Sequence, residues 1–222
     1  MAIPPIDRLL DLSHTLAAPL FDGKRYAWEI LPHLKDFIRE LGASLPRGEY
    51  TEIAPEVWAH KTATIAPTAL IAGPTVIGAG TEVRHCAFIR GAALVGEGCV
   101  VGNSTEIKNA VIFDNVQIPH YNYVGDSVLG FRSHMGAGVV ASNFRSDKGN
   151  VNVHDGDETI VTGLRKLGTI LGDGADVGCN SVLCPGSVVG RDSIIYPLSR
   201  VRGVVPERSI LKGDGSVVPR KI

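Results

Sequence analysis

The chain has 222 residues, of which 44% are apolar, and its formal net charge is −1. It is therefore long enough to bury a full core, and its charge gives no electrostatic reason to expect a nucleic acid or an anionic membrane as a partner. The sequence contains no apolar run of membrane-spanning length, no signal-peptide core at its start, no CxxC pair and no zinc-finger spacing, so we expect a reduced, cytoplasmic protein.

The sequence of residues 1–60 predicts a helical region. A short helix is expected after Pro5, and a longer amphipathic helix over residues 26–41, where apolar residues recur at helical spacing. Pro32 is expected to interrupt the first turn of the longer helix, and Gly42 is expected to end it.

From residue 61 to residue 205 the sequence repeats every six residues. An aliphatic residue occupies the first slot of nearly every hexad, and a small residue follows four positions later. The aliphatic residues form two series: Ile65, Ile71, Ile77, Val83, Ile89, Val95, Val101, Ile107 and Phe113, then Leu171, Val177, Leu183, Val189, Ile195 and Val201. A period of six fits a triangular prism wound from short strands, three hexads to a coil. The predicted fold class is an all-β solenoid, a parallel β-helix whose coils stack about 4.8 Å apart.

The small slot of each hexad is expected to lie near a corner of the prism, where a larger side chain would collide. Cys99 occupies one such slot, so we interpret it as a packing residue. An open end of a β-helix exposes unpaired strand edges, and we therefore expect the helical region of residues 1–60 to cap the first coil.

The repeat loses its regularity in two places. After the slip at Phe113, the first slot is expected to return at Tyr123, Leu129 and Met135. The repeat is absent from residues 141–168, which we interpret as a loop excursion from one corner that lies over a neighbouring surface. A long irregular stretch in a compact domain is usually functional or disordered. Residues 206–222 are expected to form a C-terminal tail that ends irregularly.

The slip contains the sequence PHYNYVGD (119–126), preceded by GNSTEIKN (102–109) and followed by HMGAG (134–138). Together these segments resemble the acetyltransferase half of the bifunctional enzyme that makes UDP-N-acetylglucosamine, and still more the bacterial and archaeal sugar-phosphate transferases that share its C-terminal β-helix. The resemblance covers residues 60–205. It implies a left-handed β-helix and an acetyl-CoA-dependent N-acetyltransferase. The implied substrate is an amino-sugar phosphate such as glucosamine 1-phosphate, or a nucleotide-linked amino sugar.

The resemblance also implies roles for single residues. A protonated amine cannot attack a thioester, so a base must remove a proton as the nitrogen adds to the acetyl group. His120 matches the family's catalytic base, and Glu106 matches the acidic residue that orients its imidazole. Substrate-binding positions of the family are matched by Arg90, Lys108, Tyr123, His134 and one further lysine, which is Lys166 when counted back from Leu171 and Lys148 when counted forward from Asn143.

Four further positions match the family's acetyl-CoA site. Ala137 falls where a backbone N–H approaches the thioester oxygen. Asn143 and Phe144 match an Asn–aromatic pair beside the cofactor. Cys179 stands where relatives have a small hydroxyl residue near the pantetheine arm. Because the family transfers the acyl group directly, we expect Cys179 not to be a nucleophile, and we expect no metal requirement.

Three departures from the family pattern leave the exact sugar open. His134 stands where the family has a substrate-binding asparagine. Gly149 and Asn152 fall where some archaeal relatives carry lysines. Pro197 and Leu198 replace the small pair that usually lines the CoA channel.

The resemblance further implies a homotrimer in which each site contains residues from neighbouring chains. Residues 1–60 stand where the bifunctional enzyme has its nucleotidyltransferase domain. Their glycines, Gly23, Gly42 and Gly48, are too widely spaced for a nucleotide-binding loop. We therefore expect the chain to acetylate an amino sugar and not to form the UDP-sugar bond.

Two other interpretations stay open at this point. The β-helix also hosts zinc carbonic anhydrases, which place three histidines at subunit boundaries. His85 and His120 are suitably separated, but the expected third ligand position is Gly125. The other interpretation is a non-catalytic scaffold that binds partners. The altered sugar and CoA positions favour it, and the intact Glu106, Lys108, His120 and Tyr123 oppose it.

Overall fold

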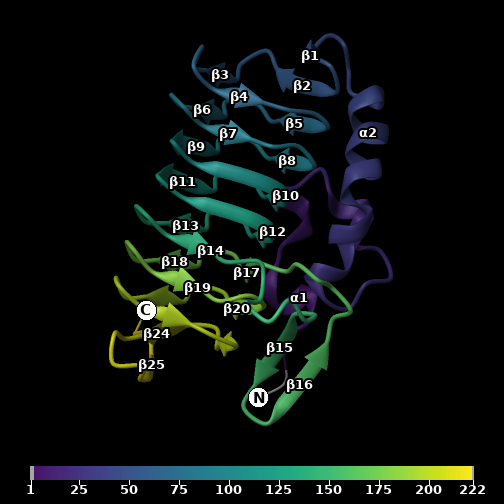
Figure 1. Ribbon diagram of the computed structural model, residues 1–222. Coiled ribbons are helices and arrows are strands. Elements are labelled where there is room, and N and C mark those ends of the chain that lie inside the picture. The colour runs from purple at the N-terminus through teal and green to yellow at the C-terminus, as the bar shows by residue number, and fades with distance from the viewer. Residues whose placement is uncertain (1–2, 222) are drawn as a thin grey trace.

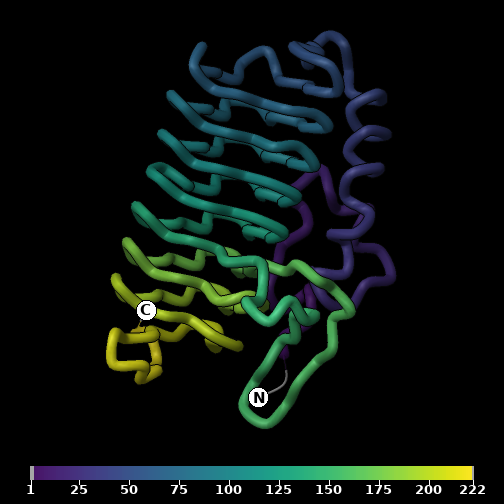
Figure 2. The backbone as a smooth tube through the Cα atoms, viewed as in Figure 1, coloured from purple at the N-terminus to yellow at the C-terminus, as the bar shows by residue number. Residues whose placement is uncertain are grey.

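The structure is a computed structural model that describes residues 3–221, and it shows a stack of triangular coils with the N-terminal helices along one side (Figures 1 and 2). The β-solenoid predicted from the six-residue repeat is confirmed. Each coil contributes one short strand to each of three faces, which we call A, B and C. Within residues 3–221, no helix is both long enough and apolar enough to cross a membrane.

Face A carries the strand that ends each coil. Its members pair in parallel from the first coil to the last: β2 (Val57–His60), β5 (Thr75–Ile77), β8 (Ala93–Val95), the second halves of β10 (Glu106–Ile112) and β12 (Tyr123–Leu129), β17 (Thr169–Leu171), β20 (Ser187–Val189) and β23 (Val204–Val205).

Faces B and C carry the remaining strands. Face B consists of β4 (Leu70–Ile71), β7 (Phe88–Ile89), the first halves of β10 and β12, β14 (Val140–Ala141), β19 (Val182–Leu183) and β22 (Arg200–Val201). Face C consists of β3 (Thr64–Ile65), β6 (Glu82–Val83), β9 (Val100–Asn103), β11 (Gln117–His120), β13 (His134–Met135), β18 (Asp176–Val177), β21 (Ile194–Ile195), β24 (Ser209–Leu211) and β25 (Val217–Pro219). β24 belongs to the solenoid, which therefore extends beyond the predicted boundary at residue 205.

The first slot of each hexad points into the prism and stacks on the same slot of the next coil. Ile71 pairs with Ile89, for example, and Ile77 with Val95, three hexads later in each case. Buried hydroxyls fill several of the small slots and bond across the corners. The Thr81 hydroxyl donates to the carbonyl of Gly96 at 2.7 Å. The small slot therefore satisfies backbone carbonyls as well as avoiding collisions. Cys99 is buried, as expected for a packing residue, and burial raises the pKa of its thiol to about 12.

The slip in the repeat arises because β10 and β12 continue around a corner without ending. The corner residues Asn109 and Asp126 have φ of +48° and +49°, a conformation that asparagine and aspartate tolerate better than most residues. Ile107 pairs with Val124, so the spacing between these two residues is one residue shorter than three hexads. Val124 is fully buried, so it fills the inward slot, and the prediction of Tyr123 for that slot is wrong by one residue.

The slip also displaces Phe113 from the inward column. Ile112 pairs with Val95 and takes the inward position of that coil. Phe113 is fully buried and packs edge-on against Phe21 of the N-terminal region, with ring centroids 6.1 Å apart. Leu129 and Met135 are fully buried as predicted.

The N-terminal region lies along face A instead of over the open end of the first coil, as Figure 1 shows. It contains α1 (Ile6–Leu9), the 3₁₀ helices η1 (Leu12–His14), η2 (Ala18–Phe21) and η3 (Ala27–His33), and α2 (Leu34–Ser44). The chain is helical after Pro5 and across residues 26–41 as predicted, but the longer segment is 3₁₀ up to His33 and α-helical only afterwards. Gly42 does not end α2, and a Cβ there would lie 2.2 Å from a ring carbon of Trp58.

Two additional strands pair with the ends of the solenoid. β1 (Tyr50–Ala54) pairs antiparallel with β2 at the first coil. β25 pairs antiparallel with β24 at the last coil. The C-terminal tail is therefore more regular than expected. Strand β1, and not the predicted helix, covers the first edge of face A.

The excursion of residues 141–168 contains an antiparallel hairpin, β15 (Asn152–Asp155) and β16 (Glu158–Val161), which Figure 1 shows beside the last coils. An antiparallel bridge between Phe144 and Lys166 closes its base. Gly186 and Gly203 let β15 approach the corner between faces B and A, since a Cβ at either glycine would lie within 2.8 Å of a β15 carbonyl oxygen. The excursion thus lies over the protein's own surface.

Candidate active site

A ridge runs along the corner between faces C and B, and it carries three of the predicted site residues on successive coils. These are His120, Ala137 and Cys179, each two residues beyond the inward residue of a face C strand. Backbone hydrogen bonds link the coils along the ridge: Gly138 N–H donates to the His120 carbonyl (3.0 Å) and Asn180 N–H to the Ala137 carbonyl (2.8 Å). The order of His120, Ala137 and Cys179 along the ridge is therefore fixed by the coil spacing.

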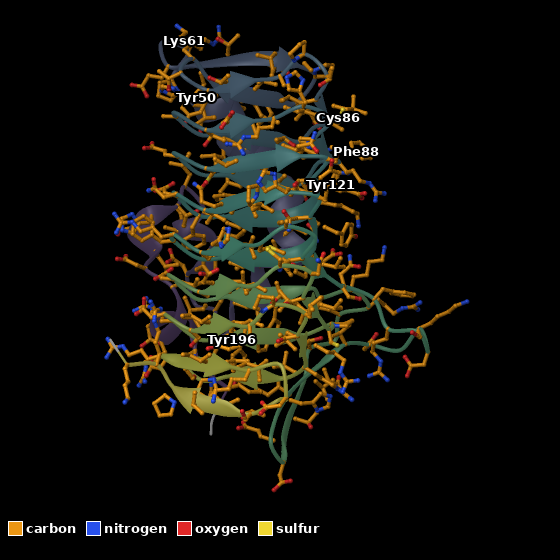
Figure 3. All side chains as sticks on the ribbon, turned by 90° about the vertical axis from the view of Figure 1, so that its left-hand side faces the viewer. Tyr50, Lys61, Cys86, Phe88, Tyr121 and Tyr196 are labelled. Carbon is orange, nitrogen blue, oxygen red and sulfur yellow. The ribbon has the colours of Figure 1, made fainter. Side chains whose placement is uncertain are left out.

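The His120 side chain is exposed on this ridge. Its backbone N–H donates to Oδ1 of Asn122 at 3.0 Å, and the Asn122 amide donates to the Gly136 carbonyl at 2.7 Å. Asn122 is 3% exposed and thereby ties the His120 loop to the coil that holds Ala137. The sequence motifs assign no role to Asn122, although a polar residue in a small slot signals such a bond. Figure 3 shows the neighbouring Tyr121 on the same edge of the solenoid as Cys86.

The backbone N–H of Ala137 has no acceptor among residues 3–221, whereas its neighbours Gly136 and Gly138 donate to backbone carbonyls. A backbone N–H that is not used within the solenoid can donate a hydrogen bond to a developing oxyanion. Cys179, one coil further along, is exposed and unpaired. Gly136 allows the close contact between these two coils, because a Cβ there would lie 2.8 Å from the Cys179 nitrogen.

Face B, next to the ridge, carries the charged candidates. Glu106 accepts a hydrogen bond from Nη1 of Arg90 at 2.7 Å, which raises the pKa of the arginine above its ordinary value. Lys108 follows on the same strand, at the level of Gly125 on the next coil. The structure therefore brings Arg90, Glu106 and Lys108 together. In this arrangement Glu106 binds the guanidinium of Arg90, and it makes no hydrogen bond to His120 within residues 3–221.

Tyr123 pairs with Glu106 on face B. Its hydroxyl accepts a hydrogen bond from Nδ2 of Asn143 at 3.2 Å. Burial raises the pKa of Tyr123, and the Asn143 bond opposes that shift in part. The phenol is therefore neutral near neutral pH and can donate its proton to a ligand oxygen. Asn143 is only 9% exposed, so its amide reaches Tyr123 from inside the protein, and its contact with a cofactor stays a prediction.

His134 lies on face C, away from the group on face B. Its Nδ1 is 2.8 Å from Oδ1 of Asp176 on the next coil, and this hydrogen bond lowers the pKa of Asp176. The structure does not bring His134 together with Arg90 or Lys108 in one chain.

The bridge at the base of the excursion distinguishes the two lysine candidates. Lys166 pairs with Phe144, and the next residue donates its N–H to the Asn143 carbonyl at 3.0 Å. Lys148 lies instead in a tight turn, where its N–H donates to the Arg145 carbonyl and its φ is +60°. The geometry places Lys166, and not Lys148, beside the Asn143–Phe144 pair.

One of the three departures from the family pattern lies at the far end of the ridge. Pro197 and Leu198 follow Cys179 one coil later, and the Leu198 side chain is 78% exposed. His85 also lies on the ridge, two coils before His120, with Asn103 between them. Within the described chain, no three His, Cys, Asp or Glu side chains are placed to hold a metal ion, so nothing in this geometry favours the zinc interpretation.

No family model matches the chain, but individual proteins resemble it. The chain is 34% identical over 179 residues to an uncharacterized acetyltransferase, YaiX, of Escherichia coli O6:K15:H31, covering 71% of this chain and 76% of that protein. It is 37% identical over 111 residues to a bifunctional sugar-1-phosphate nucleotidylyltransferase/acetyltransferase of Sulfurisphaera tokodaii.

A third relative is the bifunctional protein GlmU of Methanococcus maripaludis, which is 32% identical over 136 residues. The matches cover 26% of the Sulfurisphaera protein and 33% of the Methanococcus protein, so the chain spans only part of these bifunctional relatives. Among solved structures, a hexapeptide transferase family protein from Anaplasma phagocytophilum is 20% identical, with a TM-score of 0.42 over 75% of this chain and 81% of that one.

Proposed function

We propose that this chain, which belongs to the hexapeptide-repeat acetyltransferases, transfers the acetyl group of acetyl-CoA to the amine of an amino-sugar phosphate or a nucleotide-linked amino sugar. The observation that carries the proposal is the juxtaposition of the ridge with face B. An exposed imidazole and a backbone N–H that has no acceptor within residues 3–221 stand on adjacent coils. Two cations, a carboxylate and a phenol lie on the neighbouring face.

In the proposed reaction, the amine nitrogen attacks the thioester carbon while His120 accepts a proton from the nitrogen. The carbonyl oxygen becomes an oxyanion, and the N–H of Ala137 stabilises it. Collapse of this intermediate forms the amide bond and breaks the C–S bond. The proton held by His120 then passes to the departing thiolate, which leaves as the free thiol of CoA. No cysteine takes part in the transfer.

The Arg90–Glu106 ion pair suggests how the sugar phosphate prepares the site. A phosphate dianion competes with Glu106 for the guanidinium, since Arg90 is 44% exposed and can accept a second anion. Lys108 adds a second cation on the same face. Release of Glu106 from Arg90 makes its carboxylate available to the imidazole of His120, so substrate binding and activation of the base are coupled.

The last coils offer cations for the phosphates of CoA. Arg145, Arg200 and Arg202 line a hollow with Phe144 and Cys184, between face B and the base of the excursion. Arg145 is already paired with Asp147, whereas Arg200 and Arg202 are exposed and make no ion pair within residues 3–221. The cofactor would extend from this end towards Ala137.

The proposal includes a homotrimer. Face A is covered by the N-terminal region and the hairpin, which leaves faces B and C and the ridge for contact with other copies. Exposed apolar side chains are present there, including Leu70 (62%), Tyr121 (67%) and Leu198 (78%). A neighbouring copy that covers the ridge would bring its His134 or its cations to the site of the first. Light scattering that gives a monomer at micromolar concentration would overturn this assembly.

The direct test is an acetyl-transfer assay that follows release of the CoA thiol. Purified protein is mixed with acetyl-CoA and, in parallel, with glucosamine 1-phosphate, galactosamine 1-phosphate or UDP-glucosamine. At least one of these amines should accelerate thiol release well above the hydrolysis seen without an acceptor. If none of the three does so, the proposed substrate class is wrong.

A further inference from the structure

The segment PHYNYVGD ends in Gly125 and Asp126, for which the reaction above supplies no role. Asp126 is 4% exposed at the corner between faces B and A. A carboxylate so deeply buried needs donors for both of its oxygens. The structure supplies them from the coils on either side.

The Asp126 carboxylate is the centre of a ladder of side chains. Oδ1 accepts a hydrogen bond from Nδ2 of Asn109 at 2.7 Å, and Oδ2 accepts one from Nδ2 of Asn143. The same Asn143 nitrogen donates its other proton to the Tyr123 hydroxyl. One carboxylate therefore fixes the amide that orients the phenol of the proposed substrate face.

The ladder also reaches the end of the excursion. The backbone carbonyl of Asp126 accepts a hydrogen bond from the N–H of Gly168 at 2.8 Å, and Asn143 begins the excursion. Both ends of the excursion are thus held by the residues that hold Tyr123. Gly125 makes the ladder possible, because a Cβ there would lie 2.6 Å from both Nδ2 of Asn143 and the Tyr123 hydroxyl oxygen.

We propose that Asp126 is a positioning residue which, through Asn143, holds the Tyr123 hydroxyl in place for the sugar substrate. The effect of Asp126 on substrate binding rests on the proposed acetyl transfer, whereas its effect on the orientation of the Asn143 amide does not. The carboxylate is needed because two amide N–H donors point at its two oxygens. An asparagine has only one carbonyl oxygen, so one rung of the ladder must break.

The test is the substitution Asp126→Asn, which keeps the shape and the left-handed conformation that asparagine tolerates. We expect the KM for the best amino sugar to rise about tenfold, the order expected for a lost hydrogen bond to a charged group, while the KM for acetyl-CoA changes less than about twofold. Tyr123→Phe should cause a similar rise. The double variant Asp126→Asn/Tyr123→Phe should be no worse than Tyr123→Phe alone, because Asp126 acts through that hydroxyl.

A matched control is Asp192→Asn. Asp192 is also a corner aspartate with positive φ (+54°), but its carboxylate makes no hydrogen bond within the described residues. Asp192→Asn should leave both KM values unchanged. Asp126 does not position Tyr123 if the rises in the amino-sugar KM caused by Asp126→Asn and Tyr123→Phe multiply in the double variant. The same conclusion follows if Asp192→Asn raises this KM as much as Asp126→Asn does.

A second readout is independent of acetyl transfer. In protein labelled with ¹⁵N-asparagine, the side-chain amide of Asn143 should exchange slowly with solvent in the wild type and in Asp192→Asn, and rapidly in Asp126→Asn. Slow exchange in Asp126→Asn would overturn the proposal. If no amino sugar is acetylated and the exchange still follows this pattern, the substrate assignment fails while the link from Asp126 to Asn143 holds.

Discussion

Faces A and B are built from the same coils, and in two coils from the same strands, yet one is buried and the other carries the proposed chemistry. Strand β10 passes from Glu106 and Lys108 on face B to Val111 on face A within a few residues. The inward residues of the two faces are alike, Ile107 and Ile112 in this strand, and both are fully buried. The difference lies in the outward slot, which is apolar on face A and variable on face B.

The outward slot of face A is filled by Val76, Leu94, Val111, Val128, Ile170 and Val188, each at most 1% exposed. The corresponding residues of face B include Phe88, Glu106, Tyr123, Val182 and Arg200. The inward column specifies the solenoid, whereas the outward columns decide what each face contacts. The four predictions below change one outward slot or one corner at a time.

The largest effect is expected at the ridge. His120→Asn should lower kcat for acetyl transfer by about 10²–10⁴, the usual contribution of a positioned base, with little change in the unfolding midpoint because the side chain is exposed. His85→Asn, two coils earlier on the same ridge, is the control and should retain nearly full activity. A His120→Asn rate above half that of the wild type would place the base elsewhere.

The second prediction compares two valines in outward slots. Val188→Asp on face A buries a charge beneath the N-terminal region and the hairpin, because Val188 is fully buried, and should lower the free energy of unfolding by about 3 kcal/mol or more. Val182→Asp on face B, where the valine is 41% exposed, should cost less than about 1 kcal/mol. Urea denaturation measures both, and equal losses would show that face A is not covered in solution.

The third prediction concerns the cations of face B. Lys108→Ala should raise the KM for a phosphorylated amino sugar about tenfold, since it removes one charge-assisted hydrogen bond to the phosphate. The KM for glucosamine without a phosphate should stay within about twofold, because that substrate offers Lys108 no anion. Initial rates with the two sugars give the comparison. A parallel rise for both sugars would mean that Lys108 acts on the fold or on the base.

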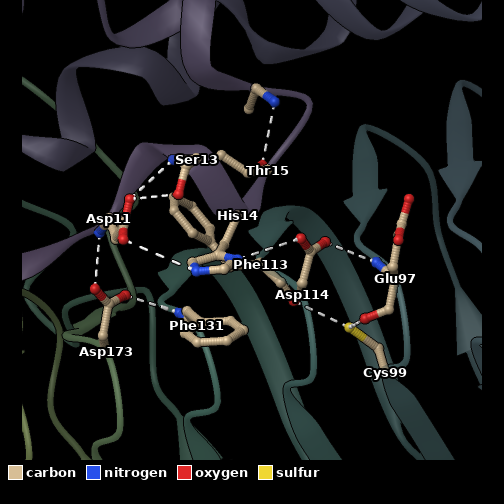
Figure 4. A network of polar contacts seen from close by, with 11 residues as sticks. Asp11, Ser13, His14, Thr15, Glu97, Cys99, Phe113, Asp114, Phe131 and Asp173 are labelled. Atoms are coloured by element: carbon tan, nitrogen blue, oxygen red, sulfur yellow. Dashed lines mark hydrogen bonds and ion pairs between the residues drawn. The ribbon is translucent and has the colours of Figure 1, made fainter.

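The smallest effect is expected at the corner where the N-terminal region attaches beside face A, shown in Figure 4. Asp114 accepts a hydrogen bond from the Glu97 N–H at 2.8 Å, and burial raises the pKa of its carboxyl. A pKa raised by folding means that ionisation of Asp114 destabilises the folded state near neutral pH, and that this cost is lost as the pH falls through the folded-state pKa.

Asp114→Asn should therefore be slightly more stable than the wild type near neutral pH, by less than about 1 kcal/mol. The difference should be smaller at acidic pH, below the raised pKa of the wild-type carboxyl, than at neutral pH. Unfolding midpoints at the two pH values test this. A gap that widens in acid would show that the interaction of Asp114 with His14, 3.9 Å away, outweighs its burial.

The two faces also differ in how much of their structure can be predicted from the sequence. The inward column was predictable because a period of six admits one architecture, and its residues needed no knowledge of neighbours. The position of the N-terminal region along face A is predictable in principle, since every third outward slot from Val76 onwards is aliphatic. The expectation that this region caps the first coil rests only on the unpaired strand edges there. The prediction that Gly42 ends the helix is wrong because the close contact of Gly42 with Trp58 cannot be seen in the sequence.

The register of the slipped coils could not be predicted in the same way. Tyr123 and Val124 both suit an inward slot, and the choice depends on two corners that β10 and β12 turn without ending. The ladder of Asn109, Asp126 and Asn143 follows from that register, because only then do the three corners stack. The role of Asn122 could not be predicted for a similar reason, since it joins His120 of its own coil to Gly136 of the next coil.

The antiparallel strands at the two ends of the solenoid limit how it can grow. A parallel coil edge is a template on which another copy could add its own coils and so extend the stack into a filament. β1 on face A at the first coil and β25 on face C at the last coil run against the direction of the strands that they cover. An incoming coil would meet an edge of the wrong polarity on one face at each end. The same strands that complete the backbone hydrogen bonds therefore oppose end-to-end stacking of further coils.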